Sequence, residues 1–318
     1  MATGYHPGEL LVQHRADLTG EANSSLGAIG ESVPAVAADF LAEQPMIILG
    51  GTDRAGRVWA TQLTGTPGFL RSPDPRTLII DALPLPEDPL ADLLGPADAP
   101  AGTADAERPA RLGMIAIEPA TRRRMRLNGR AFPGVGGLHV ALDQVIANCP
   151  KYLQKRDFRI LRAADAQAQA AARTVTSGSA LSAAQQRTVR EADTFFVATA
   201  SDSGDADASH RGGNPGFVQV LSPTRLRWPD YIGNAMFLTL GNLALNPAAG
   251  ILFPNWRTGS VLHLSGTAHT VWDEEERSRV PGAQRLVEFC VTDVREISAA
   301  SPLRWSDPGY SRFNPPVG

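Results

Sequence analysis

Residues 194–201 read Thr-Phe-Phe-Val-Ala-Thr-Ala-Ser, and residues 46–53 read Met-Ile-Ile-Leu-Gly-Gly-Thr-Asp. Each stretch is an apolar run of strand length that opens into a polar turn. The two stretches are 148 residues apart, and further along residues 250–268 match residues 113–131 at an offset of 137. Because such matches follow one another in the same order, the sequence predicts two homologous halves.

Short apolar or alternating runs predict strands in both halves. Residues 78–80, 114–117 and 250–253 are apolar runs, and residues 260–266 and 287–292 alternate between apolar and polar side chains. Short strands of this kind suit a small barrel better than a layer of parallel strands. The expected fold class is therefore mainly β with helices (α+β).

Helices are expected where apolar residues recur at helical spacing or where capping residues stand. The segments are residues 33–43, residues 182–192 with Ser182 and Gln185 as a capping box, residues 138–156, and residues 234–243 with Asn234 as the N-cap. The last of these helices has no counterpart in the first half. There, residues 83–108 are rich in Pro, Ala, Asp and Gly and are expected to form a loop.

The boundary between the halves is placed by composition. Residues 163–181 are dominated by Ala, Gln, Ser and Thr, which is typical of a linker. The expected organisation is a first half over residues 1–162, this linker, and a second half over residues 182–318.

Composition excludes several classes of protein. The net charge of −3 argues against a surface for nucleic acid or an anionic membrane, and no apolar run approaches the ~20 residues of a membrane helix. The N-terminus shows no signal pattern, so a cytoplasmic location is expected. Cys149 and Cys290 are too few for a disulfide scaffold and are interpreted as small buried side chains. The six histidines show no ligand spacing, so no metal site is predicted.

Two neighbouring segments of the second half carry most of the polar chemistry. Residues 207–218 read Asp-Ala-Ser-His-Arg-Gly-Gly-Asn-Pro-Gly-Phe-Val, and residues 231–243 read Tyr-Ile-Gly-Asn-Ala-Met-Phe-Leu-Thr-Leu-Gly-Asn-Leu. Arg211 offers a planar fork of donors that suits a phosphate. A helix that starts at Asn234 presents free N–H groups and a positive dipole end, which attract an anion. A polar hairpin turn and a plain helix cap are the alternatives to a ligand site.

The combination of these two segments resembles the pyridoxamine 5'-phosphate oxidase-like superfamily of FMN-binding split barrels. Residues 6–9 (His-Pro-Gly-Glu) and 148–154 (Asn-Cys-Pro-Lys-Tyr-Leu-Gln) also resemble the members with two halves, so the resemblance covers most of the chain. It implies two tandem split β-barrels that pair within one chain as a pseudo-dimer, with FMN between them. FAD and a deazaflavin remain alternatives, and a homodimer of the whole chain stays open.

The resemblance also implies which residues meet the cofactor. It places Ser209, His210, Arg211 and Gly212 beside the flavin, and Asn234 at its phosphate. Thr239 and Asn242 follow on the same expected helix. Lys151 and Tyr152 are the residues of the first half that are expected to close the site.

The first half is expected to have no working site of its own. At the positions that match Ser209 to Gly212 it carries Thr61, Gln62, Leu63 and Thr64, and a leucine cannot hold a phosphate. Its basic run over residues 122–126 is interpreted as the solvated face of a strand with Met125 turned inward, with a phosphate contact as the alternative.

Three functions follow from the resemblance. The first is a flavin-dependent oxidoreductase that acts on an unknown small molecule with a nicotinamide electron donor. The second is a flavin- or haem-binding protein without turnover, for storage or sensing. A true pyridoxamine 5'-phosphate oxidase is disfavoured because the two-half layout departs from that enzyme. His210 is the best candidate for a catalytic group, since a histidine pKa lies near neutrality. A hydrolase pair with Ser209 is disfavoured because adjacent strand residues point to opposite faces.

Overall fold

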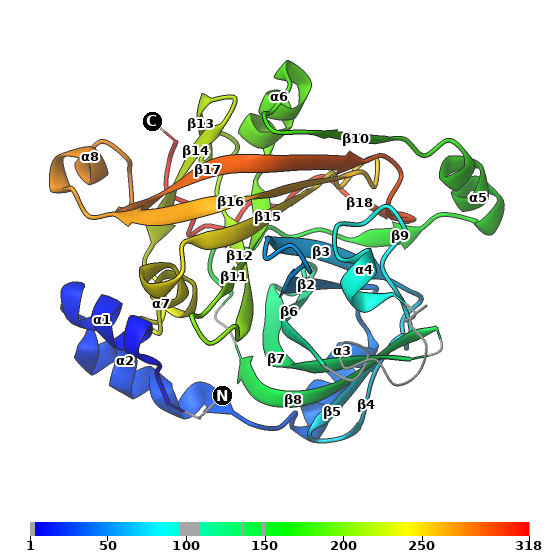
Figure 1. The fold of residues 1–318 in the computed structure, drawn as a ribbon, viewed down its shortest axis with the longest axis horizontal. Coiled ribbons are helices and arrows are strands. Elements are labelled where there is room, and N and C mark those ends of the chain that lie inside the picture. Colours follow the sequence, from blue (N-terminus) through cyan, green and yellow to red (C-terminus); the bar gives the residue numbers. More distant parts are fainter. Residues whose placement is uncertain (1–3, 96–108, 135, 148–149, 318) are drawn as a thin grey trace.

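The computed structural model describes residues 4–95, 109–134, 136–147 and 150–317. The framework of the fold is two antiparallel sheets of eight strands each, one in each half of the chain (Figure 1). The strands of the first sheet are β1 (Ile29–Gly30), β2 (Met46–Thr52), β3 (Val58–Thr64), β4 (Leu70–Asp74), β5 (Thr77–Ile80), β6 (Ala110–Glu118), β7 (Arg123–Gly134) and β8 (Gly137–Ala147). The strands of the second sheet are β10 (Val175–Gly178), β11 (Thr194–Ala200), β12 (Ala206–Gly212), β13 (Gln219–Ser222), β14 (Arg225–Tyr231), β15 (Ala248–Pro254), β16 (Val261–Val271) and β17 (Ala283–Ile297).

The two sheets have the same topology. The first runs β3-β2-β6-β7-β8-β5-β4 with β1 on β8, and the second runs β12-β11-β15-β16-β17-β14-β13 with β10 on β17. Each strand of one sheet therefore has a counterpart at the same place in the other. The predicted repeat and the predicted pair of tandem split barrels are both confirmed.

Helices and one small sheet complete the fold. The helices are α1 (Pro7–Arg15), α2 (Thr19–Ser25), a 3-10 turn (Leu26–Ala28), α3 (Ala35–Ala42), α4 (Ala91–Leu94), α5 (Ala163–Ala171), α6 (Ala183–Glu191), α7 (Leu238–Leu245) and α8 (Glu274–Ser278). β9 (Phe158–Ile160) pairs with β18 (Leu303–Trp305). Each half therefore contributes one strand to this small sheet.

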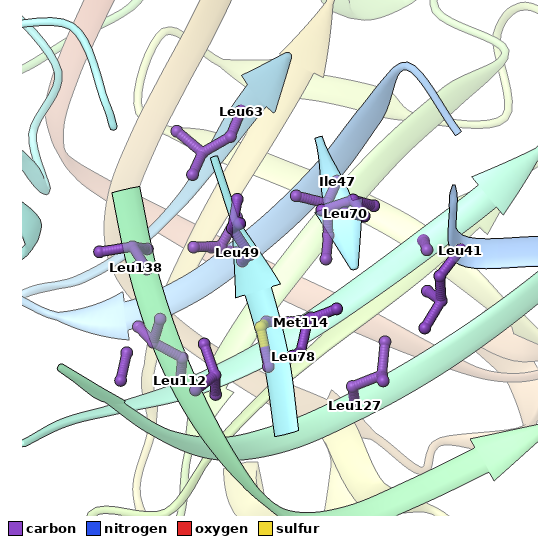
Figure 2. Packing of buried hydrophobic residues seen from close by; sticks show 14 of the residues in the cluster. Leu41, Ile47, Leu49, Leu63, Leu70, Leu78, Leu112, Met114, Leu127 and Leu138 are labelled. Carbon is purple, nitrogen blue, oxygen red and sulfur yellow. The ribbon is translucent and has the colours of Figure 1, made fainter. Parts of the chain in front are cut away.

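The described residues form four hydrophobic clusters, of which three are large. One lies inside the first barrel and includes Leu41, Ile47, Leu63 and Leu127 (Figure 2). A second lies inside the second barrel, and a third lies between the barrels and takes residues from both. Alternate residues of β2 and β11 face a barrel interior and the shared cluster, so both strands are buried on both faces. This is why their sequences are continuous apolar runs rather than alternating ones.

The barrels meet in backbone-to-backbone contact at two related positions. A Cβ on Gly113 would lie 2.3 Å from the Cα of Asp207, and a Cβ on Gly250 would lie 2.5 Å from the Cα of Trp59. Gly113 and Gly250 are counterparts in the repeat, and so are Asp207 and Trp59. The halves therefore pack about an approximate two-fold axis, as the predicted pseudo-dimer requires.

The N-terminal helices cross to the other half. α1 lies against α7 (Figure 1), and the side chain of Gln13 donates a hydrogen bond to the carbonyl oxygen of Met236. The hydroxyl of Ser25 donates to the carbonyl oxygen of Asn234 at 2.7 Å. Residues 4–25 thus form a strap over the second barrel.

Some of the predicted elements are wrong. Residues 138–147, expected to be helical, form most of β8, because Leu138, Val140 and Leu142 alternate along a strand and a bulge then buries both Val145 and Ile146. The helix expected from Asn234 begins four residues later, at Leu238. By contrast, the capping box of Ser182 and Gln185 is confirmed at the start of α6.

The segment expected as a linker contains regular structure. α5 occupies residues 163–171, and β10 pairs with β17 of the second sheet. No helix in the described parts of the chain is long and apolar enough to cross a membrane.

Candidate cofactor cavity between the two halves

A cavity of about 300 Å³ lies where the end of β12, the chain from β14 to α7, and two segments of the first half come together. Its lining residues are Leu18, Glu21, Arg124, Arg126, Lys151, Tyr152, His210, Arg211, Gly212, Phe217, Pro229, Asp230, Tyr231, Ile232, Gly233, Asn234, Ala235, Phe237, Leu238, Thr239, Leu240, Gln284 and Arg285. Both halves and the strap of α1 and α2 therefore contribute to one site.

β12 sends adjacent side chains to two different faces. His210 is opposite Phe196 in the strand pair, and the two rings make an edge contact with centroids 5.7 Å apart on the side of the shared cluster. Arg211 is opposite Phe195, which belongs to the interior of the second barrel. The cavity lies at the end of the strand, so both His210 and Arg211 line it.

The first half supplies two arginines from β7. Met125 and Leu127 turn into the first barrel, so Arg124 and Arg126 point away from it. At this strand, the side chains that point away from the first barrel face the second half and line the cavity. The run at residues 122–126 was expected to be a solvated face, and for Arg124 and Arg126 that expectation is wrong. Arg123, on the other face, remains exposed.

Positive charge dominates the lining. It carries five cationic side chains, those of Arg124, Arg126, Lys151, Arg211 and Arg285, against two carboxylates, those of Glu21 and Asp230. Arg285 is buried 3.0 Å from Asp230 and lies over the ring of Phe237, so its charge is compensated.

Arg126 and Arg211 have fewer acidic partners among the described residues. Arg126 reaches Asp207 at 3.5 Å, a carboxylate behind the cavity wall. Arg211 has no acidic partner within 4 Å among the described residues, and one of its nitrogens donates to the carbonyl oxygen of His210. The excess charge therefore gathers near the end of β12, on the side where the first half meets it.

His210 is neutral in this environment. It is buried, and desolvation together with the charges of Arg124, Arg211 and Arg126 lowers its pKa well below the usual value for histidine. The expectation of a pKa near neutrality is therefore wrong. A protonated imidazole is costly here because desolvation and three positive charges all oppose it.

Buried nitrogens of His210 and Arg126 in the cavity wall lack a hydrogen-bond partner among the described residues. The Nε2 of His210 and the Nε of Arg126 make no hydrogen bond to any described residue. Buried polar groups are nearly always hydrogen-bonded, and leaving one unpaired costs about 1–3 kcal/mol. A ligand rich in acceptors would satisfy both.

Aromatic side chains form the opposite wall. The hydroxyl of Tyr152 donates to the carbonyl oxygen of Ile232, and its ring lies 5.0 Å from that of Tyr231. Burial raises the pKa of Tyr231 to about 12, so its phenol keeps its proton. Tyr152 has a positive φ of 65°, a conformation that non-glycine residues seldom adopt. Gly212 makes room for it, since a Cβ there would lie 2.0 Å from the carbonyl oxygen of Tyr152.

The structure brings most of the residues predicted for the site to this cavity. Those in the lining are Lys151, Tyr152, His210, Arg211, Gly212, Asn234 and Thr239. Asn234 is exposed in a loop, where its side chain accepts a hydrogen bond from the backbone of Met236, and it does not cap a helix. Asn148 and Cys149, quoted with the same motif, lie outside the described residues.

Ser209 and Asn242 are placed behind the cavity wall. Ser209 is fully buried and hydrogen-bonds Asp207 and Thr239, each at 2.9 Å. Asn242 donates to the hydroxyl of Thr199. These contacts hold β11, β12 and α7 together, so the two side chains support the cavity wall.

Sequence reasoning did not assign Arg124, Asp230, Tyr231 or Arg285 to the site. The alternation of arginine with Met125 and Leu127 was a usable signal that Arg124 leaves its own barrel. What the sequence did not show is that this face meets the second half, because that contact depends on the packing of two barrels.

At the related place, the described residues of the first half carry different side chains. Leu63, the counterpart of Arg211, is buried in the first barrel's core (Figure 2). Val261 and His263 stand where Arg124 and Arg126 stand in the repeat. His263 is fully buried, and its Nδ1 lies 2.9 Å from the carbonyl oxygen of Ala60.

Comparison with known proteins gives the following matches. A family model described as pyridoxamine 5'-phosphate oxidase matches residues 181–304. No curated protein matches the chain. Among solved structures, a putative pyridoxamine 5'-phosphate oxidase from Lactobacillus delbrueckii is 17% identical, with a TM-score of 0.30, over 36% of this chain and 93% of its own.

Two further solved structures are similar. A FAD-binding protein from Mesorhizobium loti is 16% identical, with a TM-score of 0.28, over 39% of this chain and 97% of its own. An FMN-binding protein from Syntrophomonas wolfei is 8% identical, with a TM-score of 0.28, over 35% of this chain and 82% of its own. The matched family model covers residues 181–304, in the second half, and agrees with the superfamily that the sequence resembles, while the first half repeats the sheet topology of that segment.

Proposed function

We propose that this protein is an FMN-dependent oxidoreductase that binds one flavin per chain in the cavity between its halves. The observation that carries the proposal is the convergence of His210, Arg211, Arg124 and Arg126 from both halves, where the Nε2 of His210 and the Nε of Arg126 have no acceptor among the described residues. The match of residues 181–304 to a family model described as pyridoxamine 5'-phosphate oxidase supports the redox assignment.

The chemistry of the lining fits FMN. A phosphate dianion supplies the acceptors and the charge that Arg211, Arg124 and Arg126 require. Ring carbonyl oxygens and ring nitrogens are acceptors for the Nε2 of His210. Tyr152 and Tyr231 offer flat surfaces to the isoalloxazine.

A bound flavin supplies the transfer of electrons or hydride, and the protein supplies binding, orientation and electrostatics. Arg211 and the two arginines of β7 hold the anionic end, while the strap of α1 and α2 helps to exclude water through Leu18 and Glu21. A small organic substrate is the proposed second ligand, and a nicotinamide is the proposed electron donor.

Haem binding fits this cavity less well. A histidine that ligates iron normally donates its other ring N–H to an acceptor. The other ring nitrogen of His210, Nδ1, instead faces the guanidinium of Arg124 at 2.9 Å. No other histidine is among the described residues that line the cavity.

Reconstitution of the purified protein tests the proposal. Equilibrium dialysis against FMN, FAD and haemin should show tight binding of FMN at one equivalent per chain, with weaker binding of the other two. Anaerobic addition of NADH or NADPH should then bleach the flavin absorbance. A protein that takes up none of the flavins would contradict the proposed function, and binding without bleaching by any donor would reduce it to flavin binding alone.

A further inference from the structure

The proton on His210 can be placed from its contact with Arg124. The terminal nitrogen of Arg124 lies 2.9 Å from the Nδ1 of His210. A guanidinium is protonated at every ordinary pH and has donors but no acceptor. The Nδ1 must therefore accept, and in a neutral imidazole the single proton is then on Nε2.

The charges around the ring keep it in that state. Arg124 and Arg126 approach from β7 and Arg211 from its own strand β12, and each opposes a second proton on the imidazole. No carboxylate lies within 4 Å of His210 among the described residues, although His6, His263 and His269 each have one at that distance or closer. Phe196 covers the ring with an edge contact and contributes no charge.

The remaining nitrogen has no partner in the protein. His210 is 4% exposed and lines the cavity, and its Nε2 makes no hydrogen bond to the described residues. A buried N–H that stays unpaired is costly, so its natural partner is an acceptor that a ligand brings.

We propose that Arg124 is a positioning residue that fixes His210 as the neutral Nε2–H tautomer, so that His210 donates a hydrogen bond to an unprotonated acceptor atom of the bound cofactor. The hydrogen bond to the cofactor rests on the proposed function, whereas the assignment of the tautomer does not. The arrangement exists on one side of the molecule only, since the counterparts of Arg124 and His210 are Val261 and Gln62. His210 then acts as a fixed donor and exchanges no proton as the pH changes.

Nitrogen NMR of the full-length protein, labelled with ¹⁵N at histidine and free of flavin, tests the tautomer directly. The resonances of His210 are identified by their loss in His210→Gln. We expect a protonated Nε2 and an unprotonated Nδ1, with no change of either between about pH 5 and pH 8, the range over which an ordinary histidine titrates. A proton on Nδ1, or a titration inside this range, would overturn the proposal.

Substitutions of Arg124 show whether it is the cause. In Arg124→Met we expect both tautomers to appear and His210 to begin titrating nearer neutrality, because a donor and a positive charge are both lost. Arg124→Lys keeps a donor-only cation and should retain the Nε2–H tautomer. Arg123→Met removes the exposed neighbour on the other face of β7 and should change nothing. A spectrum of Arg124→Met identical to that of wild type would overturn the role of Arg124.

The cofactor contact is tested in the same proteins. His210→Phe keeps a flat ring without a donor, and we expect its FMN affinity to fall about tenfold, the loss of one hydrogen bond. We also expect the Nε2–H resonance of the wild type to shift when FMN is added. FMN that binds with no shift and no loss in His210→Phe would overturn the contact. Failure of the wild type to bind FMN would instead overturn the proposed function, while the tautomer result would stand on its own.

Discussion

Arg211 and Leu63 occupy the same position of the repeat but have opposite environments. Leu63 is buried in the first barrel's core, while Arg211 is half-buried and lines the cavity of the second. Burial lowers the pKa of Arg211, and the nearby charge of Asp230 opposes that effect, so the guanidinium keeps its proton at neutral pH. A half-buried cation with no acidic partner within 4 Å in the described part of the chain needs an anion to offset its desolvation.

The first prediction concerns this residue. In Arg211→Leu, which copies the first half, FMN affinity should fall about a hundredfold, because a charge-assisted contact with phosphate contributes about 2–3 kcal/mol. Circular dichroism should show an unchanged fold. Flavin absorbance after gel filtration measures the loss. Arg187→Leu, which removes an exposed arginine on α6, is the control and should retain its flavin.

At the scale of elements, the contact between α1 and α7 is unusually close. A Cβ on Gly8 would lie 2.1 Å from the carbonyl oxygen of Gly241, and a Cβ on Gly241 would lie 2.7 Å from the backbone nitrogen of Glu9. The neighbouring atoms belong to the backbone and cannot rotate away. The absence of side chains at these two positions lets the strap lie flat on the second barrel.

The second prediction follows from this crossing. Gly8→Ala should lower stability by about 1–3 kcal/mol, the usual cost of forcing extra atoms into a packed contact. Gly20→Ala in α2 adds a Cβ with no atom within 4 Å and should be neutral or slightly stabilising, since alanine favours helix. Urea unfolding of both variants measures the difference. Equal stability of the two would show that α1 does not dock as described.

The third prediction uses the carboxyl group of Glu9, which the same crossing buries. Desolvation, with the charge of Asp207, raises its pKa to about 7, although the backbone N–H of His6 and the charge of Arg126 oppose the shift. The folded state therefore holds this proton more tightly than the unfolded chain does. Its contribution to stability should be fully present below about pH 4.5 and lost as the pH rises to about 7, in total about 3 kcal/mol.

Thermal melts between these pH values measure the effect. Glu9→Gln cannot ionise, so it should lose less stability than wild type as the pH rises and should be the more stable protein above pH 7. Glu191→Gln on the exposed surface of α6 should follow the wild type. A wild-type melting temperature that rises from pH 4.5 to 7 while Glu9→Gln stays flat would have the wrong sign.

Strands were easier to predict than helices in this chain. The buried runs of β2 and β11 are recognisable because strands covered on both faces are continuously apolar. The segment at residues 138–147 was misassigned because the bulge in β8 shifts the alternation, so that Leu138, Leu142 and Val145 enter the first barrel's core at a spacing that imitates a helix, while Ile146 is buried on the opposite face. Asn234 suggested a cap, yet α7 begins after Phe237, whose φ of 59° no sequence signal marks.

At the scale of the molecule, the halves share a fold but not a site. Both have the same strand order, and the shared cluster joins them. Only one of the two related positions combines the arginine on the β12 side with two arginines from the facing strand β7. The motif around Arg211 could be found from sequence, whereas the contribution of Arg124 and Arg126 depended on which face of one barrel meets the other.

The fourth prediction is one flavin per chain. Titration of the full-length protein with FMN should end at one equivalent. Leu63→Arg should not add a second, because Val261 and His263 replace the two arginines of β7 and the introduced side chain would enter a packed core. Two equivalents of similar affinity in the wild type would reveal a working site in the first half.

The covalent connection between the halves changes how the cavity responds to dilution. A pocket shared by separate subunits comes apart by mass action as the protein becomes scarce. Here Arg124 and His210 belong to one polypeptide, so their encounter is intramolecular and has an effective concentration set by the chain itself. The pocket should therefore be as complete in a single isolated molecule as in a concentrated solution, and its affinity for a ligand should not depend on how many copies of the protein are present.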